Sequence, residues 1–337
     1  NIEVRWDRNV GEAGNAGLQP AVTRDAVFVA NADGELFRLD PVTGKKVWKI
    51  DTGFKISGGV GTGDGLVVLR GLKCELAAFD EDGKLRWMTK VSSEVLSAPQ
   101  IAEGMVVVRT SDGRIAALSA QDGSRQWLYE RATPALIVRN HAGVVIRRGV
   151  VFAGFAAGKL SAISLSNGAV IWESAVSQPR GNTELERISD ITSLPALDSS
   201  SVCAVAFQGR IACFDAKQAA MLWSREISSD KGLALMHNYL YVSDADGVLL
   251  ALEKSSGSTL WKNDQLFMRR VSAPYVMEKF VLVGDFEGYL HVLSREDGSL
   301  LARVRTDGSP ILFAPVALGK GILLQTQDGG VYSIEIN

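Results

Sequence analysis

Apolar and polar residues alternate in short runs along most of this chain, beginning with residues 2–6, where every second residue is apolar. A period of two predicts half-buried β-strands. Many runs end in a tight turn that contains Asp and Gly, as at Asp40 and Gly44, and the next run carries a tryptophan, here Trp48. Gly44 supplies the backbone freedom that such a turn needs, and Asp40 can hydrogen-bond into it.

This unit of strand, turn and tryptophan strand recurs. Successive tryptophans from Trp6 to Trp261 are 42, 39, 40, 45, 51 and 38 residues apart, and a further copy keeps the turn glycine Gly298 but has Ala302 in place of tryptophan. A repeat of about 40 residues built of short strands is typical of a β-propeller blade. We expect each tryptophan to pack its blade against the next one and not to bind a ligand.

Four classes of strand run through the repeats, and each class has eight members. Third strands are predicted at 35–40, 75–80, 114–119, 159–164, 210–215, 248–253, 289–294 and 330–335. Innermost strands are predicted to begin near Gln19, Ser57, Ser97, His141, Ser193, Gly232, Ser272 and Phe313. The sequence therefore predicts an all-β fold, an eight-bladed β-propeller of four-stranded antiparallel blades.

The two ends of the chain complement each other. Residues 330–335 form a third strand with no fourth strand after it, and residues 2–6 form an outer strand with no strands before it. We expect residues 2–6 to complete the C-terminal blade, since this closure removes the open edges. The whole chain, 1–337, is then predicted to be a single propeller domain.

Composition narrows the possible functions. The formal net charge is −2, which argues against a nucleic-acid or anionic-membrane surface, and no apolar run approaches the roughly 20 residues of a membrane helix. The chain starts at Asn1 without Met or a signal peptide, so we expect a mature or trimmed form.

Catalytic and metal-binding patterns are hard to find. The three histidines, His141, His237 and His291, are widely separated, and no triad, zinc motif or phosphate loop is present. Acidic turns such as 244–247 lack the remaining ligands of a calcium loop and are better explained as hairpin turns. We therefore predict no enzyme activity, no metal and no cofactor.

The three cysteines, Cys74, Cys203 and Cys213, lack metal-binding spacing. Cys203 and Cys213 fall on two strands of one hairpin. A disulfide is open to them if the register places them opposite each other, but the sequence favours two buried thiols.

Two links between blades are unusually long. Eleven positions separate Trp48 from the matching inner-strand residue Gly59, whereas the link after Trp127 is longer by about 5 residues and the link after Trp172 by about 11. These links follow blades 3 and 4, so they should be neighbours on one face. Long insertions in a compact repeat are usually functional or disordered.

The content of both links favours a protein interface, because apolar residues are accompanied by charges of both signs. The alternative is that the apolar residues fold inward and the charges are merely solvated. The residues predicted to bind a protein are Leu136, Val138, Arg139, Glu184, Arg187, Ile188, Asp190 and Thr192.

The Asp-Gly-Trp repeat resembles the repeat of pyrroloquinoline-quinone (PQQ) dehydrogenases and their non-enzymatic relatives. Within that superfamily the chain is similar to the BamB lipoprotein family, part of the machinery (BAM) that assembles β-barrels into bacterial outer membranes. The resemblance covers essentially the whole chain, and its most specific stretches are 184–195 (ELERISDITSLP) and 280–290 (FVLVGDFEGYL).

This resemblance implies a partner and a location. The family binds the periplasmic POTRA domains of BamA through a Leu-x-Leu-Arg segment, matched here by Leu136, Val138 and Arg139, and an Asp-x-Asp segment, matched by Asp190 with Thr192 in place of the second Asp. It also implies other BAM subunits and unfolded outer-membrane proteins as partners, a position at the periplasmic face of the outer membrane, and an N-terminal lipid anchor upstream of Asn1.

Two other functions compete with this non-catalytic scaffold. A PQQ-dependent dehydrogenase would need a calcium site, a catalytic Asp, stacked aromatic rings and adjacent cysteines, and it would be longer than this chain. A propeller that binds a small ligand or a sugar is the other alternative.

Overall fold

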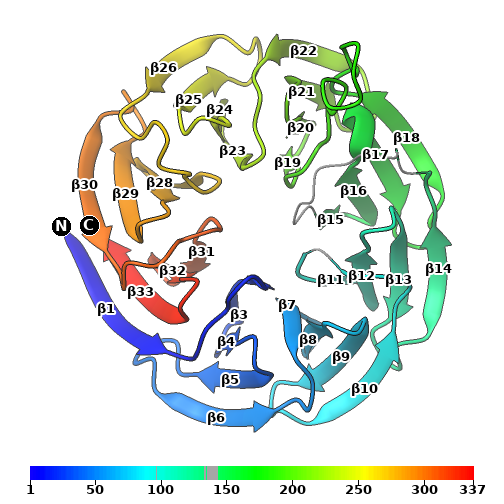
Figure 1. Ribbon diagram of the computed structural model, residues 1–337, viewed down its shortest axis with the longest axis vertical. Helices are drawn as coiled ribbons and strands as arrows, with labels where there is room; N and C mark the ends of the chain where they lie inside the picture. Colours follow the sequence, from blue (N-terminus) through cyan, green and yellow to red (C-terminus); the bar gives the residue numbers. More distant parts are fainter. Residues whose placement is uncertain (96, 133, 135–142) are drawn as a thin grey trace. The chain divides into compact units, whose positions relative to one another are not determined.

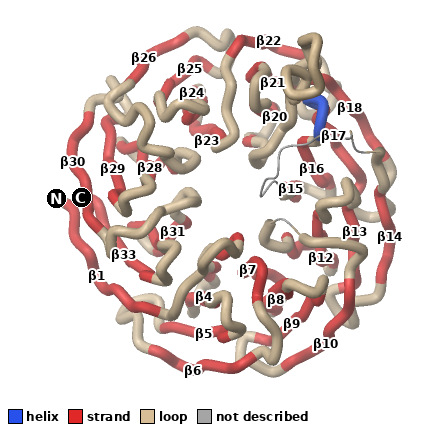
Figure 2. The backbone as a smooth tube through the Cα atoms, in the orientation of Figure 1, coloured by secondary structure: helices blue, strands red, loops and turns tan. Residues whose placement is uncertain are grey.

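The structure is a computed structural model that describes residues 1–95, 97–132, 134 and 143–337. It is an all-β, eight-bladed β-propeller of antiparallel blades, as the repeat predicts. Figure 2 shows that strands, loops and turns make up nearly all of the described residues, with a short helical turn at Ala156–Gly158. Among the described residues, no helix has the length and apolar character needed to cross a membrane.

The chain divides into two compact units. Unit 1 comprises residues 1–130, 287–289 and 304–337, and unit 2 comprises residues 131–286 and 290–303. The single-domain organisation of 1–337 stays a prediction.

Unit 1 holds four blades. Their strands are, for blade 1, β3 (Ala21–Val22), β4 (Val27–Ala30), β5 (Glu35–Leu39) and β6 (Lys46–Asp51); for blade 2, β7 (Ile56–Gly63), β8 (Leu66–Gly71), β9 (Glu75–Asp80) and β10 (Leu85–Lys90); for blade 3, β11 (Gln100–Ala102), β12 (Met105–Arg109), β13 (Ile115–Ser119) and β14 (Arg125–Tyr129); and for blade 8, β31 (Val316–Leu318), β32 (Gly321–Gln325), β33 (Gly330–Ile336) and β1 (Ile2–Asn9). A short strand that the sequence did not predict, β2 (Gly17–Leu18), pairs in parallel with β7.

Unit 2 holds blades 4 to 6 and most of blade 7. Their strands are, for blade 4, β15 (Val144–Arg147), β16 (Val150–Gly154), β17 (Lys159–Ser164) and β18 (Val170–Ala175); for blade 5, β19 (Ala196–Leu197), β20 (Ser201–Val205), β21 (Arg210–Asp215) and β22 (Met221–Glu226); for blade 6, β23 (Gly232–Met236), β24 (Tyr239–Ser243), β25 (Leu249–Glu253) and β26 (Thr259–Asn263); and for blade 7, β27 (Tyr275–Met277), β28 (Phe280–Gly284), β29 (Tyr289–Ser294) and β30 (Leu300–Arg305).

The N-terminal strand completes the last blade, which confirms the predicted closure. β1 pairs antiparallel with β33, from Ile2 opposite Ile336 to Asn9 opposite Gly330, with an irregularity between Val4 and Trp6. The strand is longer than the predicted residues 2–6. Figure 1 shows the two ends of the chain side by side, and the Asn1 amino group donates to the Asn337 carbonyl at 2.6 Å.

Innermost strands begin later than predicted in most blades. Five of them begin at the residue that follows a proline: Ala21, Gln100, Ala196, Tyr275 and Val316. Proline has no N–H to donate to the ladder, so pairing starts after it. His141, predicted near the start of one such strand, lies outside the described residues, and that strand begins at Val144.

Within each unit, tryptophans of the outer strands dock onto the next blade, as predicted. Trp87 packs in a buried cluster with Val106 and Leu118 of blade 3, and its Nε1 donates to the Ala120 carbonyl at 2.9 Å. The corresponding indole of blade 6, Trp261, donates to the Arg295 carbonyl at 2.9 Å. The rings therefore serve as packing groups with one satisfied polar atom.

The prediction for two of the cysteines is wrong. Cys203 and Cys213 form a disulfide between β20 and β21. The strand register places them directly opposite each other, with their Cα atoms 4.1 Å apart. Closely spaced residues of an antiparallel pair can be bridged without moving the backbone, whereas sequence alone does not fix the register.

Reduction of this disulfide should destabilise the protein by about 2.5 kcal/mol, the chain-entropy expectation for a loop of this size. Urea unfolding followed by tryptophan fluorescence, with and without a reductant, measures the change. A Cys203→Ala/Cys213→Ala variant is the control, and its unfolding midpoint should not respond to the reductant. A wild-type midpoint equally insensitive to reductant would contradict the prediction.

Candidate functional site

The first long link lies mostly outside the described residues. Leu136, Val138 and Arg139 belong to that segment, so their role stays a prediction. Arg131 at its start is described: its guanidinium forms an ion pair with Glu173 of β18 and lies 5.1 Å from the centroid of the Phe155 ring. The hydrogen bond from Arg131 holds the pKa of Glu173 below its usual value.

The second long link, residues 176–195, connects β18 to β19 and begins with a compact turn. Thr183 Oγ1 accepts a hydrogen bond from the Glu186 amide at 3.2 Å, while Glu186 Oε2 accepts from the amides of Asn182 at 2.7 Å and Thr183 at 3.2 Å. This reciprocal pattern is a capping box. The two amides that donate to Glu186 hold its pKa below the usual value.

Asp190 lies at the base of this loop. Its side chain is buried, and its Oδ1 accepts a hydrogen bond from the Ala157 amide at 3.1 Å. Its carbonyl accepts from the Phe207 amide at 2.9 Å. Asp190 thereby ties the loop to the turn after β16 and to the end of β20, in addition to any role in binding.

The neighbours of Asp190 are buried as well. Ile191 is 1% exposed, and its amide donates to the Phe155 carbonyl at 3.1 Å. Thr192 is also buried, and its Oγ1 has no hydrogen-bond partner among the residues that the structure describes. The predicted contact residue Thr192 thus sits within the loop base and not on its surface.

The exposed part of the loop combines apolar and charged side chains. Glu184, Leu185 and Arg187, which we call the loop crest, are all exposed, Leu185 to 67%. Arg187 Nε donates to the Gly181 carbonyl at 3.2 Å, which orients this side chain along the loop. An exposed leucine beside charges of both signs suits the core and rim of a protein interface.

A hollow of about 470 Å³ lies beside the loop crest, lined by Pro134, Ala157, Pro179, Glu184, Arg187, Ile188 and Asp190. It brings together four of the predicted residues: Glu184, Arg187, Ile188 and Asp190. Thr192 does not line it. The sequence prediction left Leu185 out of the binding residues, although the Thr-x-x-Glu spacing from Thr183 to Glu186 indicates the turn that exposes it.

Metal chemistry has little support in the described part of the chain. There, no group of three or more His, Cys, Asp and Glu side chains could hold an ion. The acidic turns use their carboxylates locally: Asp244 Oδ1 accepts from the amides of Asp246 and Val248, both at 2.9 Å. This is the hairpin-turn arrangement that the sequence predicts.

Known proteins give a consistent picture. The family model described as "Outer membrane protein assembly factor BamB" matches residues 3–55 and 32–263. A protein of that name from Nitrosomonas eutropha is 44% identical over 336 residues, covering 99% of this chain and 82% of the relative. One from Burkholderia pseudomallei is 39% identical, covering 98% and 87%. These relatives are named as assembly factors, in agreement with the prediction of no enzyme activity.

Solved structures extend the comparison. The crystal structure of BamB from Moraxella catarrhalis matches with a TM-score of 0.91 and 25% identity, over the whole of both chains. A quinohemoprotein alcohol dehydrogenase from Pseudomonas putida matches with a TM-score of 0.77 and 10% identity, covering 99% of this chain and 76% of the enzyme, and shares the fold alone. The chain belongs to the BamB family of outer membrane protein assembly factors.

Proposed function

We propose that this protein is a non-catalytic scaffold that assists the assembly and insertion of β-barrel proteins into the outer membrane by binding the periplasmic POTRA domains of BamA. It acts at the periplasmic face of the outer membrane, held there by a lipid anchor in the full-length form. Other BAM subunits and unfolded outer-membrane proteins are further partners. Family membership supports the assembly role.

The observation that carries the binding proposal is the exposed loop crest. Its capping box, together with the bond from Ala157 to Asp190, fixes the loop in the free protein. A preformed loop loses less conformational entropy on binding than a flexible loop does. Leu185 can then bury against the partner while Glu184 and Arg187 form ion pairs that set the orientation.

The proposal is tested by calorimetric titration of the protein with the POTRA segment of BamA from the same organism. We expect saturable binding with one protein per POTRA segment. The heat should also become more negative with rising temperature, since apolar burial gives a negative heat-capacity change. A modest specific interface has a Kd of roughly 1 μM. If no binding is detected at protein concentrations up to about 100 μM, far above that Kd, BamA is not the partner.

A further inference from the structure

Blades 6 and 7 place a cation at the same position, just after the third strand. Lys254 follows β25, and Arg295 follows β29. Their surroundings match: the Lys254 amide donates to the Asn238 carbonyl and the Arg295 amide to the Lys279 carbonyl, both at 2.8 Å. The backbone carbonyl of each cation, Lys254 or Arg295, also accepts the indole N–H of the preceding blade's tryptophan.

The two cations differ in what faces them. Lys254 Nζ forms an ion pair with Asp198, which directly follows β19 of blade 5. The residue of blade 6 that corresponds to Asp198 is Met236, because Leu197 pairs with Val202 as Leu235 pairs with Leu240. Arg295 Nη1 accordingly lies 2.9 Å from Met236 Sδ. A thioether is a weak acceptor and cannot neutralise a guanidinium.

Arg295 borders a cleft of about 780 Å³ between blades 6 and 7, whose lining includes Tyr239, Tyr241, Leu260, Lys279, Phe280 and Leu301. Leu260 and Leu301 are about half exposed, at 51% and 54%. The cleft therefore offers a second cation, Lys279, two tyrosines and a substantial apolar surface around the guanidinium. Burial raises the pKa of Tyr241, so its hydroxyl stays protonated and able to donate a hydrogen bond at neutral pH.

Two acidic residues, Glu296 and Asp297, also line the cleft, but neither is held against Arg295. Asp297 Oδ1 accepts hydrogen bonds from the Ser299 amide at 3.0 Å and the Ser299 hydroxyl at 2.7 Å, so it stabilises its own turn. Glu296 is exposed. Among the residues that the structure describes, neither forms an ion pair with Arg295.

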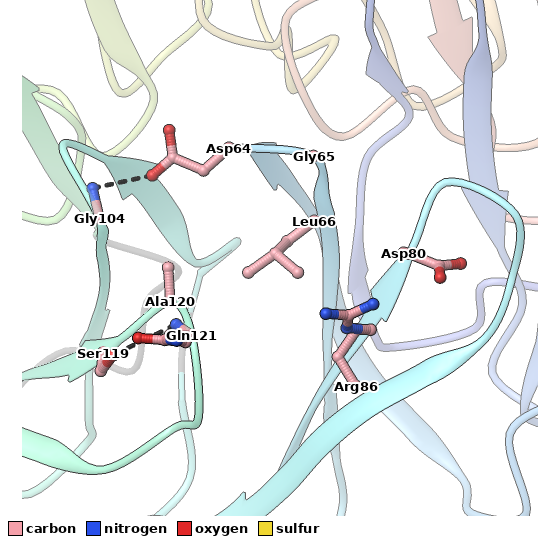
Figure 3. Close-up of a pocket in the computed structure, with 9 residues that line it drawn as sticks. All are labelled: Asp64, Gly65, Leu66, Asp80, Arg86, Gly104, Ser119, Ala120 and Gln121. Atoms are coloured by element: carbon pink, nitrogen blue, oxygen red, sulfur yellow. Dashed lines mark hydrogen bonds between the residues drawn. The ribbon is translucent and has the colours of Figure 1, made fainter.

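The corresponding cleft between blades 2 and 3 of unit 1 has no cation at the position of Arg295, although Arg86 of β10 also lines it. Figure 3 shows that cleft, with Ala120 where blade 7 has Arg295, and with the Asp64 carboxylate accepting from the Gly104 amide at 2.8 Å. The blade framework alone therefore does not require a positive charge at this position. The charge is either paired internally, as Lys254 is, or left facing a cleft, as Arg295 is.

We infer that the cleft between blades 6 and 7 binds a carboxylate carried on an aromatic or apolar group. The carboxylate occupies the place that Asp198 takes beside Lys254 and bonds to the Arg295 guanidinium, with Lys279 and the tyrosine hydroxyls close by. The apolar group lies against Leu260, Phe280 and Leu301. A charge-assisted, bidentate contact of guanidinium and carboxylate fixes the orientation of the ligand. The inference does not depend on BamA binding.

The test uses 3-phenylpropionate as the probe and saturation-transfer NMR on the full chain. We expect saturable binding in the millimolar range, the affinity typical of a small fragment. The neutral 3-phenylpropionamide should bind at least about tenfold more weakly, because it cannot form the charge interaction with Arg295 and a tenfold loss is the effect of one modest interaction. Equal binding of acid and amide would overturn the inference.

Substitutions of Met236 give a matched pair. Met236→Asp places a carboxylate beside Arg295, as Asp198 stands beside Lys254, and should weaken probe binding at least about tenfold without loss of thermal stability. Met236→Leu keeps the site apolar and should bind the probe like the wild type. If Met236→Asp, still folded by circular dichroism, binds the probe as the wild type does, the inference fails.

A second arm identifies the source of the carboxylate. The peptide acetyl-Phe-Asp-Phe-amide presents the same group on an extended chain. If the peptide binds more tightly than 3-phenylpropionate, and the Met236→Asp variant loses this binding, the result supports a protein ligand. If only 3-phenylpropionate binds, the result supports a small carboxylate. Binding of neither compound overturns the inference.

Discussion

Replacing Leu185 and Arg187 together with alanine should weaken binding to the POTRA segment by about 3 kcal/mol, or roughly a hundredfold in Kd, as expected for two interface anchors. Leu185 is 67% exposed in the free protein, so truncating it removes little internal packing, and the main loss is its burial in the complex. Removal of the Arg187 guanidinium would leave the carboxylate that it pairs with on BamA desolvated and unpaired in the complex. Calorimetric titration of the variant measures the loss, and circular dichroism shows whether the fold is kept.

A matched control is available in blade 5. Lys217 is an exposed lysine of the turn before β22, and Leu222 of β22 is 48% exposed. The variant Lys217→Ala/Leu222→Ala removes a comparable leucine and cation away from the loop crest and should bind like the wild type. If the loop crest variant binds normally, the interface lies elsewhere. If both variants lose binding, the effect is not specific to the loop crest.

Substituting alanine for Gly123, in the turn before β14, should destabilise the protein by about 3 kcal/mol. Gly123 has a φ of +75°, and a Cβ there would lie 2.5 Å from Trp87 Cε3 and 2.8 Å from Cδ2. The left-handed backbone costs an alanine about 1 kcal/mol, and displacing a packed indole adds about 2 kcal/mol. Urea unfolding measures the sum.

Gly65 separates the two contributions. Its φ is +74°, almost identical to that of Gly123, but a Cβ at Gly65 would meet no atom within 4 Å. The Gly65→Ala variant should therefore lose only the backbone contribution, about 1 kcal/mol. If the two variants lose the same free energy of unfolding, contact with Trp87 is not part of the reason why glycine is needed at position 123.

Strand positions could be predicted because they depend on local patterns. The third strand predicted at 210–215 is observed at Arg210–Asp215, and the one predicted at 35–40 is observed at Glu35–Leu39. Alternation with a period of two and a turn at each end, such as Asp33-Gly34 before and Asp40 to Gly44 after the strand at Glu35–Leu39, fix such strands within a few residues. The innermost strands were predicted less well, since a proline just before the strand moves the first hydrogen bond along the chain.

The site depends on contacts that local patterns do not contain. Loop length drew attention to residues 176–195, but the burial of Asp190 follows from its contacts with Ala157 and Phe207, which come from other turns. The exposure of Leu185 likewise follows from how the whole loop is anchored. The disulfide was missed because the sequence alone does not fix the register of β20 and β21, and the observed register places Cys203 opposite Cys213.

The pairing of β1 with β33 has a consequence for biosynthesis. β1 contains residues 2 to 9, and its partner contains residues 330 to 336. A ribosome makes β1 long before its partner, so β1 has no partner until more than 300 further residues, up to β33, have been translated. Blade 8 therefore cannot form until β33 has left the ribosome. Premature termination even a few codons before Gly330 leaves β1 without its hydrogen-bonding neighbour, and the unpaired strand becomes a target for quality-control proteases.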